Sequence, residues 1–193
     1  MNFIKRIKSI LFQPNDCWKE ISKEKGITNT IKYLLLLLPI SALLYYIISL
    51  ISLNFVKPEQ INEITKITNT FGLSIQITLL IITIVLFLIF FIITFFNSAL
   101  IHIFIKMFKG KGNFADTYKS FSYGSTPQFI LMGIPYINQV SSLYMIYLQI
   151  LGLSKLHKLN PWKAAGAIIL SYILLLLIIF VPIFIFIMSK VPI

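Results

Sequence analysis

The chain has 193 residues, of which 58% are hydrophobic and only 12% charged, which excludes an ordinary soluble domain with about a quarter of charged residues. Its 17 Lys and Arg against 6 Asp and Glu give a formal net charge of +11, a balance that can indicate nucleic-acid binding. No nucleic-acid-binding signature accompanies the lysines, so we attribute this charge to membrane topology and expect no nucleic-acid partner. The single cysteine, Cys17, excludes an intrachain disulfide and a multi-cysteine metal site.

The first twelve residues follow a helical pattern in which one side is apolar and the other basic. This pattern predicts an amphipathic helix that either lies in the headgroup region or packs on the ends of the membrane spans. A second short helix is expected after Pro14, starting at Asn15 or Asp16. We predict that residues 1–30 form a cytoplasmic segment whose membrane-surface residues are Lys5, Arg6, Lys8 and Trp18.

Three uncharged stretches are long enough to cross a bilayer, since about 20 helical residues cover the hydrocarbon layer. They predict spans at 31–53, 73–105 and 164–188. The stretch 73–105 is expected to be one helix of about 50 Å, because each helical residue adds about 1.5 Å. Its last turns should project towards the cytoplasm. The intervening residues 54–70 are predicted to form a polar loop.

Residues 120–153 carry no charge, but small residues, amides and prolines interrupt them. A tight turn is predicted at Gly133, Ile134 and Pro135, between two short helices at 118–132 and 138–153. Each helix would be about 22 to 24 Å long, so the pair either crosses the bilayer fully or re-enters.

The distribution of basic residues favours this hairpin. A hairpin places 14 Lys and Arg on the side of the N-terminus and 3 on the other side. A single crossing would instead place the basic loop 154–163 outside, against the positive-inside rule. We therefore expect a multi-pass protein of the cell membrane with a cytoplasmic N-terminus and an external C-terminus.

Three motifs follow one another in an order that resembles a known family. "LFQPNDCWKEI" supplies Phe12, Pro14, Trp18 and Ile21 before the first span. "GKGNFADTYKSFSYGSTP" follows the long second span with a Gly-rich turn and a Tyr-x-x-x-Pro, and "YMIYLQILGLSKLHKLNPWKAAGAI" leads into the last span. The chain resembles the Yip family of Ypt/Rab-interacting, five-span membrane proteins, in its prokaryotic branch.

The resemblance implies an all-α five-helix bundle with a cytoplasmic N-terminus, and a Yip-like transmembrane domain at 31–193. From the residues alone, the bundle has either five full spans or three full spans plus a short intramembrane hairpin, preceded by the amphipathic helix. Eukaryotic members of the family are associated with Rab GTPases, vesicle traffic and membrane shaping. The present sequence lacks the Asp-Leu-Tyr-Gly-Pro motif and the longer N-terminal region of that branch, so GTPase binding is not expected.

A proline marks the first candidate site, inside the predicted hairpin. Pro127 has no N–H, so the carbonyl of Tyr123 loses its helical donor and needs another one within the membrane. Ser120 and Gly124 form a small-xxx-small pair that allows close helix approach. The kink either only packs or also binds a ligand, and its residues are Tyr123, Gly124, Ser125, Thr126 and Pro127.

A polar stripe on the second span forms the other part of the candidate site. Thr94, Ser98 and His102 are spaced at i, i+4 and i+8, with Asn97 beside them. We predict that this stripe faces protein, because intramembrane polar groups rarely face lipid. His102 either is held by a hydrogen bond or binds a ligand. The candidate site residues on this span are Asn97, Ser98 and His102.

Signatures of catalysis are missing from the predicted spans. All six carboxylates lie outside them, and the spans contain no HExxH motif. We therefore expect no enzyme activity, cofactor or metal site. The first hypothesis is a membrane protein that organises the membrane or partner proteins, with lipids and unidentified membrane or cytoplasmic proteins as partners. The alternative is a subunit of a small-solute transporter or channel, with a path lined by Asn97, His102, Tyr123 and Thr126.

Overall fold

The computed structural model describes residues 2–134 and 136–188, with residues 67 and 183–188 described by their backbone alone. The described residues form helices and no strand, which confirms the predicted all-α class. Three helical stretches are long and apolar enough to cross a membrane: Thr28–Phe55, Ile75–Met107 and Pro161–Pro182. The predicted spans at 31–53, 73–105 and 164–188 fall on these three stretches.

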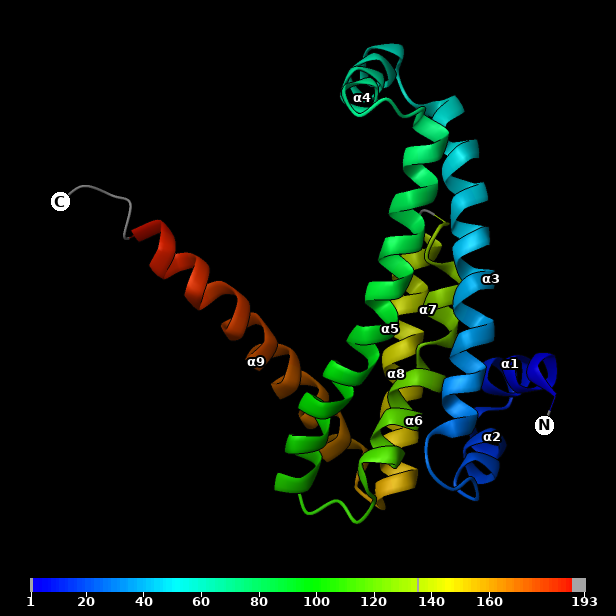
Figure 1. The fold of residues 1–193 in the computed structure, drawn as a ribbon. Helices are drawn as coiled ribbons and strands as arrows, with labels where there is room; N and C mark the ends of the chain where they lie inside the picture. Colours follow the sequence, from blue (N-terminus) through cyan, green and yellow to red (C-terminus); the bar gives the residue numbers. More distant parts are fainter. Residues whose placement is uncertain (1, 135, 189–193) are drawn as a thin grey trace.

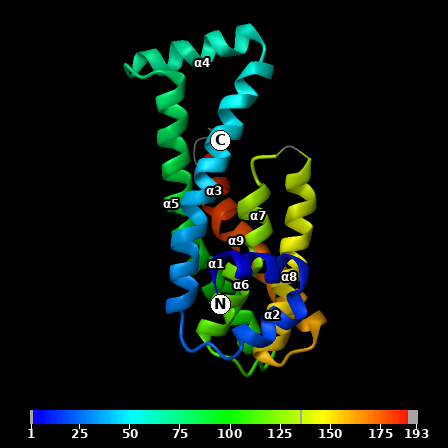
Figure 2. The same ribbon diagram turned by 90° about the vertical axis from the view of Figure 1, so that its right-hand side faces the viewer.

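Two short helices precede the first span. α1 (Phe3–Phe12) and α2 (Pro14–Ile21) lie at the end of the bundle where α3 begins, and α1 runs across the axis of α3 (Figures 1 and 2). Pro14 occupies the first position of α2, where a missing N–H costs nothing. Ile10, Cys17 and Ile21 are fully buried, so both helices pack on the bundle.

Two long helices form one side of the molecule. α3 (Thr28–Ser52) and α5 (Ile75–Met107) run antiparallel and are joined at their far end by a 3-10 turn (Leu53–Phe55) and α4 (Pro58–Thr70) (Figure 1). The single long helix predicted from residue 73 is therefore confirmed. The loop predicted at 54–70 was wrong, because most of it is α4.

The hairpin packs beside α3 and α5 and is built from three helices (Figure 2). Its first arm is α6 (Phe114–Gly124) followed by α7 (Thr126–Leu131), and its second arm is α8 (Ile137–His157). α6 begins four residues before the predicted start, because Asn113 and Asp116 form a reciprocal capping box. Figures 1 and 2 show that the turn between α7 and α8 stops well short of α4. Pro135, predicted to belong to this turn, lies outside the described residues.

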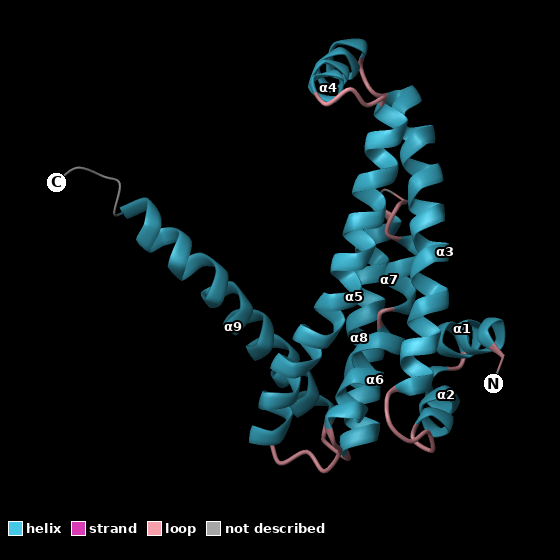
Figure 3. Cartoon of the chain, viewed as in Figure 1, coloured by secondary structure: helices cyan, strands magenta, loops and turns pink. Residues whose placement is uncertain are grey.

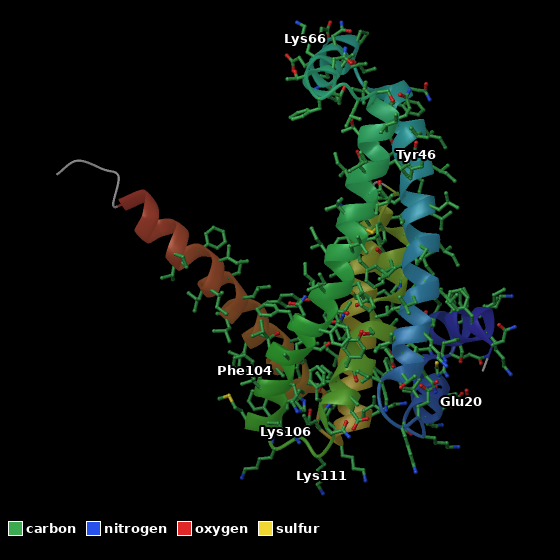
Figure 4. The ribbon with its side chains drawn as sticks, viewed as in Figure 1. Glu20, Tyr46, Lys66, Phe104, Lys106 and Lys111 are labelled. Carbon is green, nitrogen blue, oxygen red and sulfur yellow. The ribbon has the colours of Figure 1, made fainter. Side chains whose placement is uncertain are left out.

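The last helix leaves the bundle at an angle. α9 (Pro161–Met188) packs on α5 and α8 only through its first turns, where Ala164, Ala167 and Ile168 are buried (Figure 3). At the base of the bundle, Lys106 and Lys111 lie at the same end as Glu20, whereas Lys66 lies at the opposite end (Figure 4). The predicted hairpin likewise puts Lys106 and Lys111 on one side and Lys66 on the other, and which side faces the cytoplasm stays a prediction.

Candidate functional site

α6 is largely buried in the bundle, and the candidate kink lies at its end. Every residue from 117 to 127 is buried, because α5, α8 and the N-terminal segment enclose α6. Polar groups in this position can be satisfied only by other groups of the protein or by enclosed water. The five predicted kink residues therefore lie in the core and not on a lipid-facing surface.

The kink falls at Ser125, between α6 and α7. The hydroxyl of Thr126 donates to the carbonyl of Tyr123 at 2.6 Å, so the carbonyl freed by Pro127 has a donor, as predicted. Since Thr126 has only one hydroxyl proton, the hydroxyl of Tyr33 donates to its oxygen, at 2.8 Å. Thr126 therefore joins the kink to α3.

We expect the Thr126→Val substitution to destabilise the protein by about 1–3 kcal/mol. Valine keeps the shape of threonine but leaves the buried carbonyl of Tyr123 and the buried hydroxyl of Tyr33 without a partner. Thermal unfolding of the purified protein in detergent measures the effect. Thr126→Ser keeps the hydroxyl and is the matched control. Equal melting temperatures for the valine and serine variants would contradict this role.

A buried ion pair ties α1 to the hairpin. The carboxylate of Glu24, which follows α2, accepts from Arg6 through Oε1 and from the hydroxyl of Tyr123 through Oε2, the latter at 3.2 Å. The guanidinium carbon of Arg6 also lies 5.3 Å from the centroid of the Tyr123 ring, a cation–π distance. Arg6 is only 8% exposed, so the structure places it inside the protein and not at the predicted membrane surface.

A second buried cation lies beside this pair. The ammonium of Lys119 donates to the backbone carbonyl of Glu24 at 2.6 Å and to the carboxylate of Asp116 at 3.2 Å. Lys119 is 2% exposed, so it is a buried cation and not a solvated one. Neither Glu24 nor Lys119 was among the predicted site residues, because each lies among other charged residues that face solvent.

The remaining membrane-surface candidates separate into two groups. Trp18 is 1% exposed and packs on Gly152 of α8, where a β-carbon would lie 2.7 Å from the indole ring. The structure therefore places Trp18 in the core. Lys5 and Lys8 are exposed on the outer side of α1, and their position at the membrane surface stays a prediction.

The polar stripe on α5 faces protein, as its spacing predicts. Thr94 and Ser98 are buried, and each donates its hydroxyl to a carbonyl of its own helix, at 2.7 Å and 2.6 Å respectively. Asn97 is half-buried, and the hydrogen bonds of the described residues do not connect it to the stripe or to the kink.

His102 is held in a chain of three side chains. Its Nδ1 lies 2.7 Å from the hydroxyl of Thr117, which lies 3.0 Å from Nε2 of His157 at the end of α8. Because this hydroxyl has a single proton, it can donate to only one ring. Burial lowers the pKa of His157, which lies outside the predicted spans, to about 4, so this ring is neutral at pH 7. The described residues contain no cluster of His, Cys, Asp and Glu able to hold a metal ion.

These contacts have the character of a structural joint. Arg6, Glu24, Tyr33, Tyr123 and Thr126 come from five different segments, and each contact holds two of those segments together. Tyr123 reaches a cavity of about 260 Å³, which neither Asn97 nor His102 lines. The residues expected to line a transport path are therefore not brought together around this cavity.

Comparison with known proteins gives one match. A family model described as the Yip1 domain matches residues 8–183, from within α1 to the second half of α9. No curated protein and no solved structure matches the chain. The matched segment includes all three apolar stretches, the hairpin and most of the joint around Glu24.

Proposed function

The chain belongs to the Yip1 domain family of membrane proteins, and from this membership we propose that it is a non-enzymatic, multi-pass protein that organises lipids or partner proteins at one face of the cell membrane. The observation that carries the proposal is the outer face of α1. Ile4 is 61% exposed and Phe12 is 78% exposed, with Lys5 and Lys8 exposed beside them. Apolar and basic side chains on one helix face suit the interface between headgroups and acyl chains.

The proposal also depends on how firmly α1 is held. Besides the pair of Arg6 and Glu24, the hydroxyl of Tyr144 on α8 donates to the carbonyl of Leu11 at 2.6 Å. The ammonium of Lys155 on α8 donates to the side chain of Asn15 at 2.6 Å. These contacts fix α1 and α2 to the transmembrane part, so the outer face of α1 is a rigid surface and not a free tail.

Photo-crosslinking in intact membranes tests this function. We expect a benzophenone side chain at position 12 to capture lipids or a discrete set of proteins. Replacing Lys5 and Lys8 together by Gln should reduce this capture more than about tenfold, because each lysine near an anionic surface contributes about 1 kcal/mol. The same probe at position 55, where Phe55 is 84% exposed at the opposite end of α3, is the control. Identical products from positions 12 and 55 would refute the proposed role of α1.

A further inference from the structure

A polar cavity of about 260 Å³ lies between α1, the segment before α3 and the first turns of α3. Its lining includes Arg6, Glu24, Asn29, Lys32, Leu36 and Tyr123. The joint described above uses three of these side chains. The others belong to the first three turns of α3, and the contacts of the joint do not account for them.

The lining has an excess of positive charge. It contains two cations, Arg6 and Lys32, and a single carboxylate. That carboxylate, of Glu24, already accepts from Arg6 and from Tyr123 through its two oxygens. Lys32 is exposed and makes no ion pair among the described residues. One positive charge therefore remains for a ligand.

Two further donor groups beside the cavity have no partner in the part of the chain that the structure describes: one nitrogen of the Arg6 guanidinium and the first N–H groups of α3. Nη1 of Arg6 is buried and has no hydrogen-bond partner among the described residues. Because buried donors in proteins are nearly always hydrogen-bonded, an acceptor such as an anion or a water is expected beside this nitrogen. In addition, Ile27 gives the N-terminus of α3 no side-chain cap, so the first N–H groups of this 25-residue helix favour an anion beside Asn29 and Lys32.

The cavity continues into an apolar stripe along α3. Leu36, Ile40 and Leu43 follow Lys32 at helical spacing, and they are 54%, 47% and 59% exposed. Because residues at i, i+4 and i+7 share one face of a helix, the stripe leads from the polar cavity towards the middle of the predicted span. A ligand that fills both parts carries an anionic group at one end and a hydrocarbon chain at the other.

We propose that this cavity binds the phosphate of a glycerophospholipid, with an acyl chain on the stripe formed by Leu36, Ile40 and Leu43. Phosphate is the anion that membrane phospholipids carry in their headgroups, and a lysine ammonium binds it as a point charge. The proposal is independent of the role of α1 in capturing partners, because it concerns a cavity on the inner side of that helix.

Native mass spectrometry of the full-length protein in neutral detergent tests the site, with phosphatidylglycerol as the titrated lipid. We expect Lys32→Gln to weaken the binding of this lipid about tenfold, the loss of one charge-assisted contact. Diacylglycerol with the same chains lacks the phosphate, so its binding should not depend on Lys32. The matched control is Lys23→Gln, which removes another exposed lysine of the N-terminal segment outside the cavity lining.

Three results would overturn the proposal. Unchanged lipid binding by the Lys32→Gln variant would exclude the site, and an equal loss in the Lys23→Gln variant would reduce the effect to general surface charge. Glycerol 3-phosphate, which carries the phosphate without acyl chains, distinguishes a soluble phosphate ligand from a phospholipid. If it bound in a Lys32-dependent way while phosphatidylglycerol did not, the ligand would be a soluble phosphate and the lipid assignment would be wrong. A melting temperature equal to that of the unmodified protein shows that the variant remains folded.

Discussion

Replacing Glu24 by Gln should destabilise the protein by about 3 kcal/mol, because the substitution leaves the Arg6 guanidinium buried without its counterion. The two side chains are only 10% and 13% exposed, so solvent compensates little for the lost charge. The same change weakens the contact with the hydroxyl of Tyr123, and thus the attachment of α1 to α6. Thermal unfolding in detergent, followed through tryptophan fluorescence of a Trp162→Phe background in which Trp18 is the remaining tryptophan, measures the loss.

A double substitution distinguishes the effect of losing the ion pair from the effect of a general loss of packing. We expect Arg6→Met combined with Glu24→Gln to regain most of the stability, since replacing both charges removes the cost of burying one of them alone. Asp16→Asn is the control, because its pair with Lys19 is 73% and 70% exposed and should leave the melting temperature unchanged. If the effects of the two single substitutions simply added, the coupling between Arg6 and Glu24 would be refuted.

Replacing Gly152 by Ala should also destabilise the protein, by up to about 2 kcal/mol. Alanine favours a helix over glycine by about 1 kcal/mol, but its β-carbon would lie 2.7 Å from two atoms of the Trp18 ring. The ring is fully buried and rigid, so the overpacking cost of about 1–3 kcal/mol outweighs the gain. α2 would have to move away from α8, and the melting temperature should fall.

The chain offers a matched control on α9. A β-carbon at Gly166 would lie 3.5 Å from Phe108, an ordinary contact. Gly166→Ala should therefore leave stability unchanged or raise it by up to about 1 kcal/mol. Similar melting temperatures for the Gly152→Ala and Gly166→Ala variants would show that Trp18 is not tightly packed on α8.

The sequence predicted those features of the site that depend on residues close together in the chain. The spacing of Thr94 and Ser98 on α5 placed them towards protein, and Pro127 identified the carbonyl that needs a new donor. The partners of these groups could not be predicted, because they come from distant segments. Tyr33 is 93 residues away from Thr126, and a single sequence carries no signal for that contact.

The positions of charged residues were harder to predict. Arg6 lies between Lys5 and Lys8, and the helical pattern assigns all three to one polar face, although only Arg6 has a buried partner, Glu24. α4 was missed because its many Asn and Thr residues are typical of loops. Pro58 at the first helical position and Glu59 in the first turn were the available signals of a helix start.

The contacts of Glu24 also have a consequence for the order in which the protein is made. Glu24 contacts Lys119 and Tyr123 of α6, and Trp18 packs on Gly152 of α8. The surface on which α1 and α2 pack is therefore complete only after α8 has been synthesised. At about 5–20 residues per second, the ribosome needs on the order of ten seconds to add these residues. During that interval Trp18 and Glu24 lack the partners that they contact in the folded protein, so the docking of α1 and α2 on α6 and α8 is expected to be a late step of assembly.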